Sequence, residues 1–183
     1  GWLTRRYPGL RVVTIDAGDL GAREAELTDV DRVGALLRAV CDEAGAGPVM
    51  VAGQSYGGLA ALEAGLRSDV PVDEIVAQSP SLWWGGARRG IGEGTLMGDL
   101  RAGSVRPRRD VQLRLQVGTL EETMRPVVDD CAELLRRQGA DVELDHYRSG
   151  HDAAWWREGL VRALDEWEPS HMLTRNETAQ VNA

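Results

Sequence analysis

The stretch Val49–Leu62 constrains the fold more than any other part of the chain. It joins a short apolar run to an alanine- and leucine-rich segment through Gly53–Gly57, whose sequence G-Q-S-Y-G fits the pattern G-x-S-x-G. Between a strand and a helix this pattern is typical of a nucleophile elbow, a sharp turn that strains the serine backbone and exposes its hydroxyl. The following helix N-terminus favours developing negative charge. We therefore predict that Ser55 is an acyl-transfer nucleophile.

Segments typical of strands alternate with segments typical of helices along most of the chain. Short apolar or β-branched runs predict strands at residues 10–15, 48–52, 74–78, 111–117 and 141–147. Apolar residues at helical spacing predict helices that begin at Thr28 (with Asp31 completing a capping box), after the elbow, at Thr123 and at Asp152, and that end near Gly45, Arg67, Gly139 and Pro169. This alternation predicts an α/β protein with a mostly parallel sheet and helices on both faces.

The chain is predicted to form one domain. Residues 1–169 would make up its core, and the polar segment 170–183 would be a disordered tail. Residues 79–109 show little regular pattern beyond one turn of helix near Leu96–Leu100. Because so long a connection is unusual in a compact domain, we expect this loop to bind a ligand.

Charge and cysteine content limit the partners of the protein. A net charge of −8 argues against nucleic acid and anionic membrane surfaces. Cys41 and Cys131 both fall in helical patterns, which favours buried thiols in a reducing compartment, and hence a cytoplasmic protein. No apolar run approaches the roughly 18 residues of a membrane span, and no signal peptide is visible. We predict no cofactor and no metal.

A serine nucleophile needs a base, and the sequence offers three histidines. His146 lies inside a predicted strand and His171 lies in the predicted tail. His151 follows the last predicted strand directly, and the carboxyl ends of parallel strands share the edge of the sheet where binding crevices form. Ser55 would emerge at the same edge. We therefore predict His151 as the base.

The acid that orients the base should come from another strand end, between nucleophile and base in the chain. Glu121 and Glu122 follow the strand 111–117 and lie in this window. Glu121 is our choice; Glu122, or a Ser–His dyad without an acid, are the alternatives. Asp152 is expected to cap the last helix instead. The backbone N–H of Tyr56 would supply one oxyanion donor, and the second is not assigned.

Three blocks of the sequence resemble the enterochelin (ferric enterobactin) esterases, which belong to the esterase D-like branch of the α/β-hydrolases. The blocks are V-A-G-Q-S-Y-G-G-L at 51–59, Q-S-P-S-L-W-W at 78–84 and G-H-D-A-A-W-W-R at 150–157. A segment at 15–27 is also similar, and the resemblance spans about residues 12–168. It implies an α/β-hydrolase-type sheet that is N-terminally truncated relative to the family, whose N-terminal module and first core strands have no counterpart here.

The resemblance implies hydrolysis of the serine-ester backbone of a cyclic catecholate siderophore, with release of iron. Ser55 and His151 match the nucleophile and base of the family, and Glu121 falls where some members carry an acid. Basic residues that accept the anionic ferric catecholate would correspond to Arg23, with Arg88 and Arg89 as looser candidates. Arginine suits this ligand because it stays charged and stacks on aromatic planes.

Two pairs of adjacent tryptophans occur in the sequence, and we predict a different role for each member of a pair. Trp83 and Trp84 follow a strand end, so we expect one to wall the ligand pocket and the other to pack on the core. On the last helix, Trp156 fits the apolar stripe and is expected in the core, whereas Trp155 would flank His151.

Two other functions are compatible with these residues. One is a general acyl hydrolase or an acyltransferase that acts on another ester. The other is a non-catalytic binding protein that keeps the elbow but lacks a working oxyanion hole.

Overall fold

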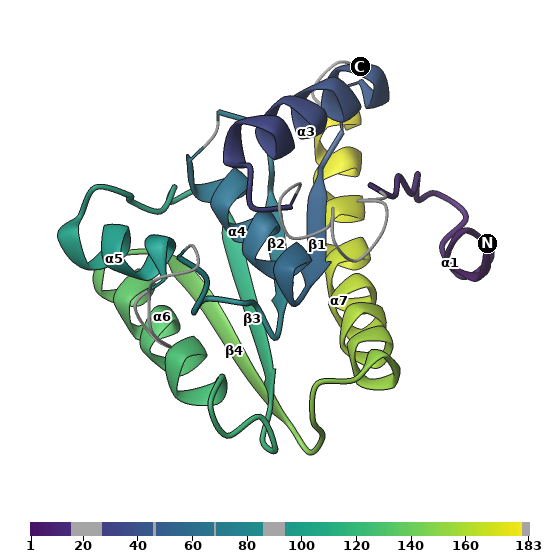
Figure 1. Cartoon of the computed structure of the whole chain (residues 1–183). Coiled ribbons are helices and arrows are strands. Elements are labelled where there is room, and N and C mark those ends of the chain that lie inside the picture. The colour runs from purple at the N-terminus through teal and green to yellow at the C-terminus, as the bar shows by residue number, and fades with distance from the viewer. Residues whose placement is uncertain (16–26, 46, 68, 86–93, 181–183) are drawn as a thin grey trace.

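The computed structural model of the protein describes residues 1–15, 27–45, 47–67, 69–85 and 94–180 (Figure 1). In chain order its elements are α1 (Trp2–Arg6), α3 (Val30–Ala44), β1 (Met50–Gln54), α4 (Tyr56–Arg67), β2 (Glu74–Gln78), α5 (Thr95–Ala102), β3 (Gln112–Gly118), α6 (Arg125–Arg137), β4 (Asp141–Tyr147) and α7 (Ala153–Gln180).

The described strands form one four-stranded sheet in the order β1-β2-β3-β4, and every neighbouring pair is parallel. Met50 at the start of β1 lies in register with Glu74 of β2, which lies in register with Gln112 of β3. All four carboxyl ends therefore meet at one edge. The predicted parallel α/β fold is confirmed.

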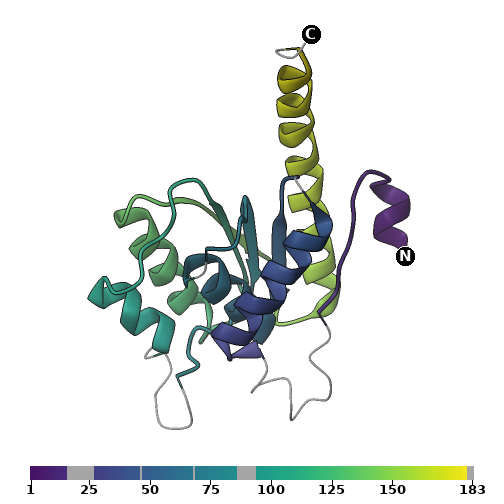
Figure 2. The same ribbon diagram turned by 90° about the horizontal axis from the view of Figure 1, so that it is seen from above.

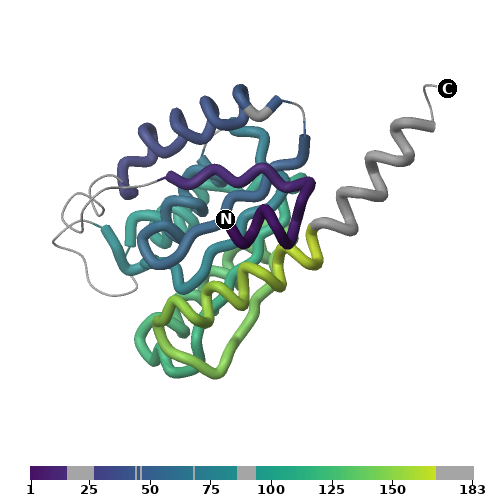
Figure 3. The backbone as a smooth tube through the Cα atoms, turned by 90° about the vertical axis from the view of Figure 1, so that its right-hand side faces the viewer, coloured from purple at the N-terminus to yellow at the C-terminus, as the bar shows by residue number. Residues whose placement is uncertain are grey.

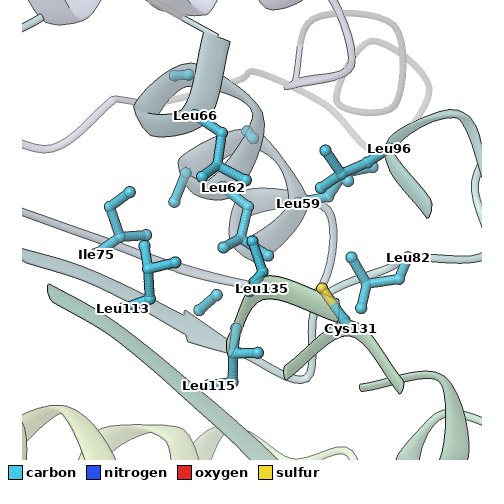
Figure 4. Packing of buried hydrophobic residues seen from close by; sticks show 14 of the residues in the cluster. Leu59, Leu62, Leu66, Ile75, Leu82, Leu96, Leu113, Leu115, Cys131 and Leu135 are labelled. Atoms are coloured by element: carbon cyan, nitrogen blue, oxygen red, sulfur yellow. The ribbon is translucent and has the colours of Figure 1, made fainter. Parts of the chain in front are cut away.

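One face of the sheet carries the main hydrophobic core. Alternate residues of β2 and β3, such as Ile75, Leu113 and Leu115, point into it and are fully buried. Helices α3, α4, α5 and α6 cover this face, and their apolar side chains interdigitate with those of the strands (Figure 4). Cys41 and Cys131 are buried here as free thiols, as predicted, and burial raises the pKa of the Cys131 thiol to about 12.

The opposite face is polar and is covered by α7, so helices lie on both faces as predicted (Figure 1). A row of side chains crosses all four strands: Gln54 Nε2 donates to Gln78 Oε1, Gln78 Nε2 to Gln116 Oε1, and Gln116 Nε2 to Asp145 Oδ2, at 3.1, 2.7 and 3.2 Å. Gln78 Nε2 also donates to the carbonyl of Trp156 in α7, at 2.8 Å. Hydrogen bonds to buried amides thus fix α7 on the sheet.

A buried arginine reinforces this attachment. Arg114 in β3, whose side chain is 3% exposed, forms ion pairs with Glu74 of β2 at 3.2 Å, Glu143 of β4 at 3.0 Å and Glu166 of α7 at 2.6 Å. We expect Arg114→Ala to lower the free energy of unfolding by roughly 3–5 kcal/mol, since it removes the only positive charge that the ion pairs above place among Glu74, Glu143 and Glu166. Urea denaturation would measure this loss. Arg162→Ala, which removes a 59% exposed partner of Glu166, is the control and should cost less than about 1 kcal/mol; equal losses would contradict the prediction.

The strand predicted at residues 10–15 is wrong. Residues 11–15 have no regular secondary structure and pair with none of the described strands; they belong to the N-terminal stretch drawn in purple in Figure 3. Val12, Val13 and Ile15 are 38%, 47% and 41% exposed. β-branched composition is only a propensity, and a strand forms only where a neighbour accepts its hydrogen bonds.

The N-terminal segment is held to α7 instead. Tyr7, which follows α1, is buried, and its hydroxyl donates to Asp165 Oδ1 at 2.6 Å. Arg6 Nη2 pairs with Asp165 Oδ2 at 2.8 Å. Tyr7, Leu164 and Trp167 form a second, smaller apolar cluster.

Several predicted boundaries are corrected. Asp29 rather than Thr28 caps α3, since its side chain accepts from the Arg32 N–H at 3.1 Å. The N-cap of α6 is Met124 rather than Thr123, with no side-chain cap hydrogen bond. The predicted strand 48–52 is shifted to Met50–Gln54, and the single helical turn expected near 96–100 is the full helix α5.

Helix α7 does not end at Pro169, as the sequence predicted, but continues to Gln180 beyond the sheet (Figure 2). Residues 170–180 of the predicted disordered tail therefore belong to this helix. A proline removes one backbone hydrogen bond, and the bonds formed on either side can carry a helix past it. Within the described residues, no helix is both long and apolar enough to cross a membrane.

Candidate active site

The turn between β1 and α4 has the geometry of a nucleophile elbow. Ser55 lies between Gln54, the last residue of β1, and Tyr56, the first residue of α4, with a backbone φ of +54°. This left-handed conformation is unusual for a residue other than glycine. The Ser55 N–H donates to the Gln78 carbonyl at 2.9 Å, and its carbonyl accepts from Leu59 N–H and Ser81 N–H, both at 3.1 Å.

Of the two glycines in the G-x-S-x-G motif, only the first is required for steric reasons. A Cβ on Gly53 would collide with the backbone of Gly57, so this position must be glycine. A Cβ on Gly57 would meet nothing within 4 Å. Gly58 is the second crowded position, because its Cβ would lie 3.1 Å from the Gln78 carbonyl oxygen. Gly53 and Gly58 therefore allow β1, α4 and the end of β2 to approach one another.

Ser81 is a neighbour of Ser55 that the sequence analysis missed. Its side chain is 1% exposed, and its Oγ lies 3.2 Å from Ser55 Oγ. Among the described residues, the Ser55 hydroxyl is hydrogen-bonded to Ser81 and not to His151. Ser81 follows the end of β2, the strand adjacent to β1, which places it near the elbow but does not by itself indicate the bond to Ser55.

His151 and Glu121 are brought together, although they come from different strand ends. Glu121 lies three residues after the end of β3, and His151 lies between β4 and α7, at the edge where β1 also ends (Figure 1). His151 Nδ1 is 2.8 Å from Glu121 Oε2. The Glu121 side chain is 3% exposed, whereas that of His151 is 39% exposed. Glu122, the alternative acid, is exposed.

The second oxygen of Glu121 is surrounded by donors. Oε1 lies 2.6 Å from Ser79 Oγ, 2.8 Å from the Gly118 N–H nitrogen and 3.3 Å from Tyr147 OH. Ser79 Oγ also contacts Tyr147 OH at 2.8 Å and accepts from Trp156 Nε1 at 3.1 Å. Burial raises the pKa of Tyr147 to about 12, so its phenol keeps its proton.

Asp152 is a helix cap, as the sequence predicted. Its Oδ1 accepts from the Trp155 N–H at 3.0 Å, and its Oδ2 accepts from the Ser149 hydroxyl. The Ser149 hydrogen bond is also the main reason why the pKa of Asp152 is lowered. The carboxylate is thus engaged at the N-terminus of α7.

The contact with His151 that was expected for Trp155 is made by Trp156, and both tryptophans are partly buried. Trp156 lies edge-on to the His151 ring, with centroids 4.7 Å apart. Trp155 stacks on Tyr147. A one-residue difference on a helix rotates a side chain by about 100°, which the apolar spacing alone did not resolve.

Trp83 and Trp84 lie in different environments, and the pocket role expected for one of them stays a prediction. Trp83 is half-buried and lies edge-on to Tyr56, with ring centroids 5.7 Å apart, so it is close to the elbow. Trp84 packs against the main core. The predicted binding residues Arg23, Arg88 and Arg89 lie outside the described residues.

Cavities near the candidate site and near α3–α5 differ in their relation to the candidate catalytic residues. One, of about 300 Å³, lies beside His151 and Glu121 and is also lined by Leu120, Glu122, Thr123 and Met124. The other, of about 540 Å³, lies between α3, α4 and α5; it is lined by Trp84 but by none of the candidate catalytic residues. The smaller cavity is therefore the one relevant to chemistry at His151. No cluster of His, Cys, Asp and Glu able to hold a metal occurs in the described part of the chain.

Comparison with known proteins identifies the family. The sequence model of the family described as "Putative esterase" matches residues 30–167. The chain belongs to this family. The matched region runs from the start of α3 into α7 and includes all four described strands.

The resemblance to enterochelin esterases is also confirmed. Over 121 residues the chain is 36% identical to the iron(III) enterobactin esterase of Escherichia coli strain K12. The aligned region covers 66% of this chain and 30% of that protein. The crystal structure of the enterochelin esterase from Shigella flexneri superposes with a TM-score of 0.74 at 32% identity. A structure of the Shigella flexneri enterobactin esterase in the presence of enterobactin gives a TM-score of 0.73 at 30% identity.

The chain spans less than half the length of these relatives. The two Shigella structures match 85% of this chain but only 42% of their own chains. Residues 30–167, the range that the family model matches, hold the elbow, the His151–Glu121 pair and the parallel sheet.

Proposed function

We propose that the protein is a serine esterase that hydrolyses the ester bonds of a catecholate siderophore trilactone such as ferric enterobactin. The observation that carries this proposal is the hydrogen bond between His151 Nδ1 and Glu121 Oε2, at the sheet edge where the Ser55 elbow ends β1. A chain of the esterase family thus combines a strained serine, a half-exposed imidazole and a buried carboxylate. This is the residue set that acyl transfer requires.

In the proposed reaction, Ser55 Oγ attacks the ester carbonyl while its proton moves to His151 Nε2. Glu121 stabilises the imidazolium through Nδ1, and the Tyr56 N–H at the start of α4 donates to the oxyanion. The imidazolium then protonates the leaving alkoxide, which departs as an alcohol and leaves an acyl-serine. Water, deprotonated by His151, attacks this ester and releases the carboxylic acid with Ser55 restored.

The resting contact between Ser55 and Ser81 is compatible with this sequence of steps. The Ser55 hydroxyl would turn from Ser81 to His151 when substrate binds, by a rotation about χ1. Hydrogen bonds of a catalytic site often reach their productive geometry only in the complex with substrate.

The substrate class is supported by the relatives and by the aromatic residues beside the elbow. The similar proteins are named enterobactin and salmochelin esterases. Trp83 and Tyr56 form an edge-on aromatic pair next to Ser55, which suits the catechol rings of such a substrate. Arg23, Arg88 and Arg89 would supply the local positive charge that an anionic ferric catecholate needs in a protein with a net charge of −8. The iron would enter as part of the substrate, and the reaction would take place in the cytoplasm.

The decisive experiment is incubation of the full chain with ferric enterobactin, followed by chromatography. We expect the trilactone to be converted to linear products by the wild type and to stay intact with Ser55→Ala. Intact trilactone together with cleavage of simple aryl esters would favour a general acyl hydrolase. Transfer of the acyl group to an added alcohol in preference to water would favour an acyltransferase. Binding of the trilactone without turnover of any ester would favour a binding protein.

A further inference from the structure

We propose that Ser79, Tyr147 and Trp156 form a positioning network that fixes Glu121 as the partner of His151 and thereby sets the tautomer of the imidazole. The three residues come from the ends of β2 and β4 and from the first turn of α7. They contact Glu121 or each other, Trp156 also lies edge-on to His151, and none of the three lines the smaller cavity. The inference rests on the proposed function, because positioning of Glu121 affects turnover only if His151 serves Ser55.

The direction of each proton in the network follows from the chemistry of the groups. Trp156 Nε1 is only a donor, so at 3.1 Å it must donate to Ser79 Oγ. An ionised carboxylate is only an acceptor, so the single Ser79 proton goes to Glu121 Oε1, 2.6 Å away. Tyr147 OH, 2.8 Å from Ser79 Oγ, then donates to it.

In this arrangement Trp156 and Tyr147 donate to Ser79 Oγ, and the Ser79 hydroxyl donates to Glu121 Oε1. The Gly118 N–H adds another donor at 2.8 Å, so the acceptor sites of Oε1 are occupied. Oε2 is left to accept from His151 Nδ1 at 2.8 Å. With the proton held on Nδ1, Nε2 is the unprotonated nitrogen, and this is the state able to accept the proton of Ser55.

The backbone of Ser79 points to the same role. Ser79 is fully buried and has a φ of +44°, which is unusual for a residue other than glycine. Its N–H donates to the Gln116 carbonyl at 2.7 Å, which holds the turn at the end of β2. A glycine would relieve the backbone but would remove the hydroxyl. The serine is thus the residue that places a donor on Glu121 at the cost of a strained conformation.

The test compares Ser79→Ala with Ser79→Gly, since both remove the hydroxyl and only glycine relaxes the backbone. The primary measurement is the ¹⁵N NMR signal of His151, which reports its tautomer without turnover. We expect the wild type to show the Nδ1–H tautomer and both variants to lose its predominance. In ester hydrolysis, kcat should fall about ten- to hundredfold in both variants, the range for loss of a hydrogen bond to a charged group. KM should change by less than about twofold.

Two controls separate positioning from stability. His146, whose Nε2 lies 2.6 Å from Asp129 Oδ1 on the surface, is an internal control in the same spectra and should not change. Tyr147→Phe deletes a donor of the network, whereas Tyr7→Phe deletes a buried hydroxyl bonded to Asp165 far from the site. We expect Tyr147→Phe to shift the His151 tautomer and Tyr7→Phe to lower only the melting temperature.

The outcomes distinguish this inference from the proposed function. An unchanged His151 tautomer in Ser79→Ala and Tyr147→Phe would overturn the network, even if Ser55→Ala abolished turnover. Wild-type kcat in Ser79→Gly would assign Ser79 a backbone role only and would also overturn it. A shifted tautomer in a protein that hydrolysed no ester would support the network while rejecting the proposed esterase. Should the Ser79 variants fail to fold, the comparison of Tyr147→Phe with Tyr7→Phe decides.

Discussion

Ser55→Ala is expected to lower kcat for ester hydrolysis by about 10⁶-fold, and His151→Ala by a similar factor. The hydroxyl is a weak nucleophile without a base, and the base has no proton to accept without the hydroxyl, so the two groups act as a unit. The double variant should therefore be no slower than either single one. Residual activity above the uncatalysed rate would come from substrate binding and the oxyanion donor of Tyr56.

A fluorophosphonate probe, which reacts with activated serines, tests the joint action of Ser55 and His151 without requiring that the substrate be known. We expect rapid labelling of the wild type at Ser55 and none of Ser55→Ala. His146→Ala is the matched control for His151→Ala, because His146 pairs with Asp129 on the surface and should retain activity. Losses that added in the double variant would show that Ser55 and His151 act independently, and equal labelling of the wild type and Ser55→Ala would reject the esterase altogether.

The fold was predictable where the sequence pattern coincides with burial. Strands β2, β3 and β4 are bounded by polar or glycine-containing turns and are apolar on the face that packs against α4 and α6, so their limits could be predicted to within a residue. Residues 10–15 have the same β-branched composition but pair with no strand of the described sheet. A strand depends on a partner distant in the sequence, and composition does not contain that information.

The candidate site was predictable only for residues that follow strand ends. Glu121 and His151 could be chosen together because parallel strands bring their carboxyl ends to one edge. Ser79 and Ser81 also follow a strand, but nothing in their own sequence indicates that Ser79 bonds Glu121 or that Ser81 bonds Ser55. Those contacts depend on the spacing of neighbouring strands and on the left-handed turn at Ser79.

Glu121→Gln is expected to lower kcat by about 10⁴-fold, because it would reverse the tautomer of His151. The reason lies in the donors at the other oxygen. The Gly118 N–H points at Oε1, so the carbonyl of the glutamine must occupy that position. The NH₂ group then faces His151 Nδ1 and donates to it. The proton of the neutral imidazole moves to Nε2, which can no longer accept a proton from Ser55.

Glu122→Gln is the matched control for this prediction. Glu122 is adjacent in the sequence and lines the same cavity, but it is exposed and His151 pairs with Glu121. We expect the kcat of Glu122→Gln to stay within about threefold of the wild type, the scale of small surface effects. Near-wild-type turnover in Glu121→Gln would mean that Ser55 and His151 work as a dyad. A large loss in Glu122→Gln alone would move the acid one residue along the chain. Since the two variants remove the same formal charge, a loss in Glu121→Gln alone cannot come from the change in net charge of the protein.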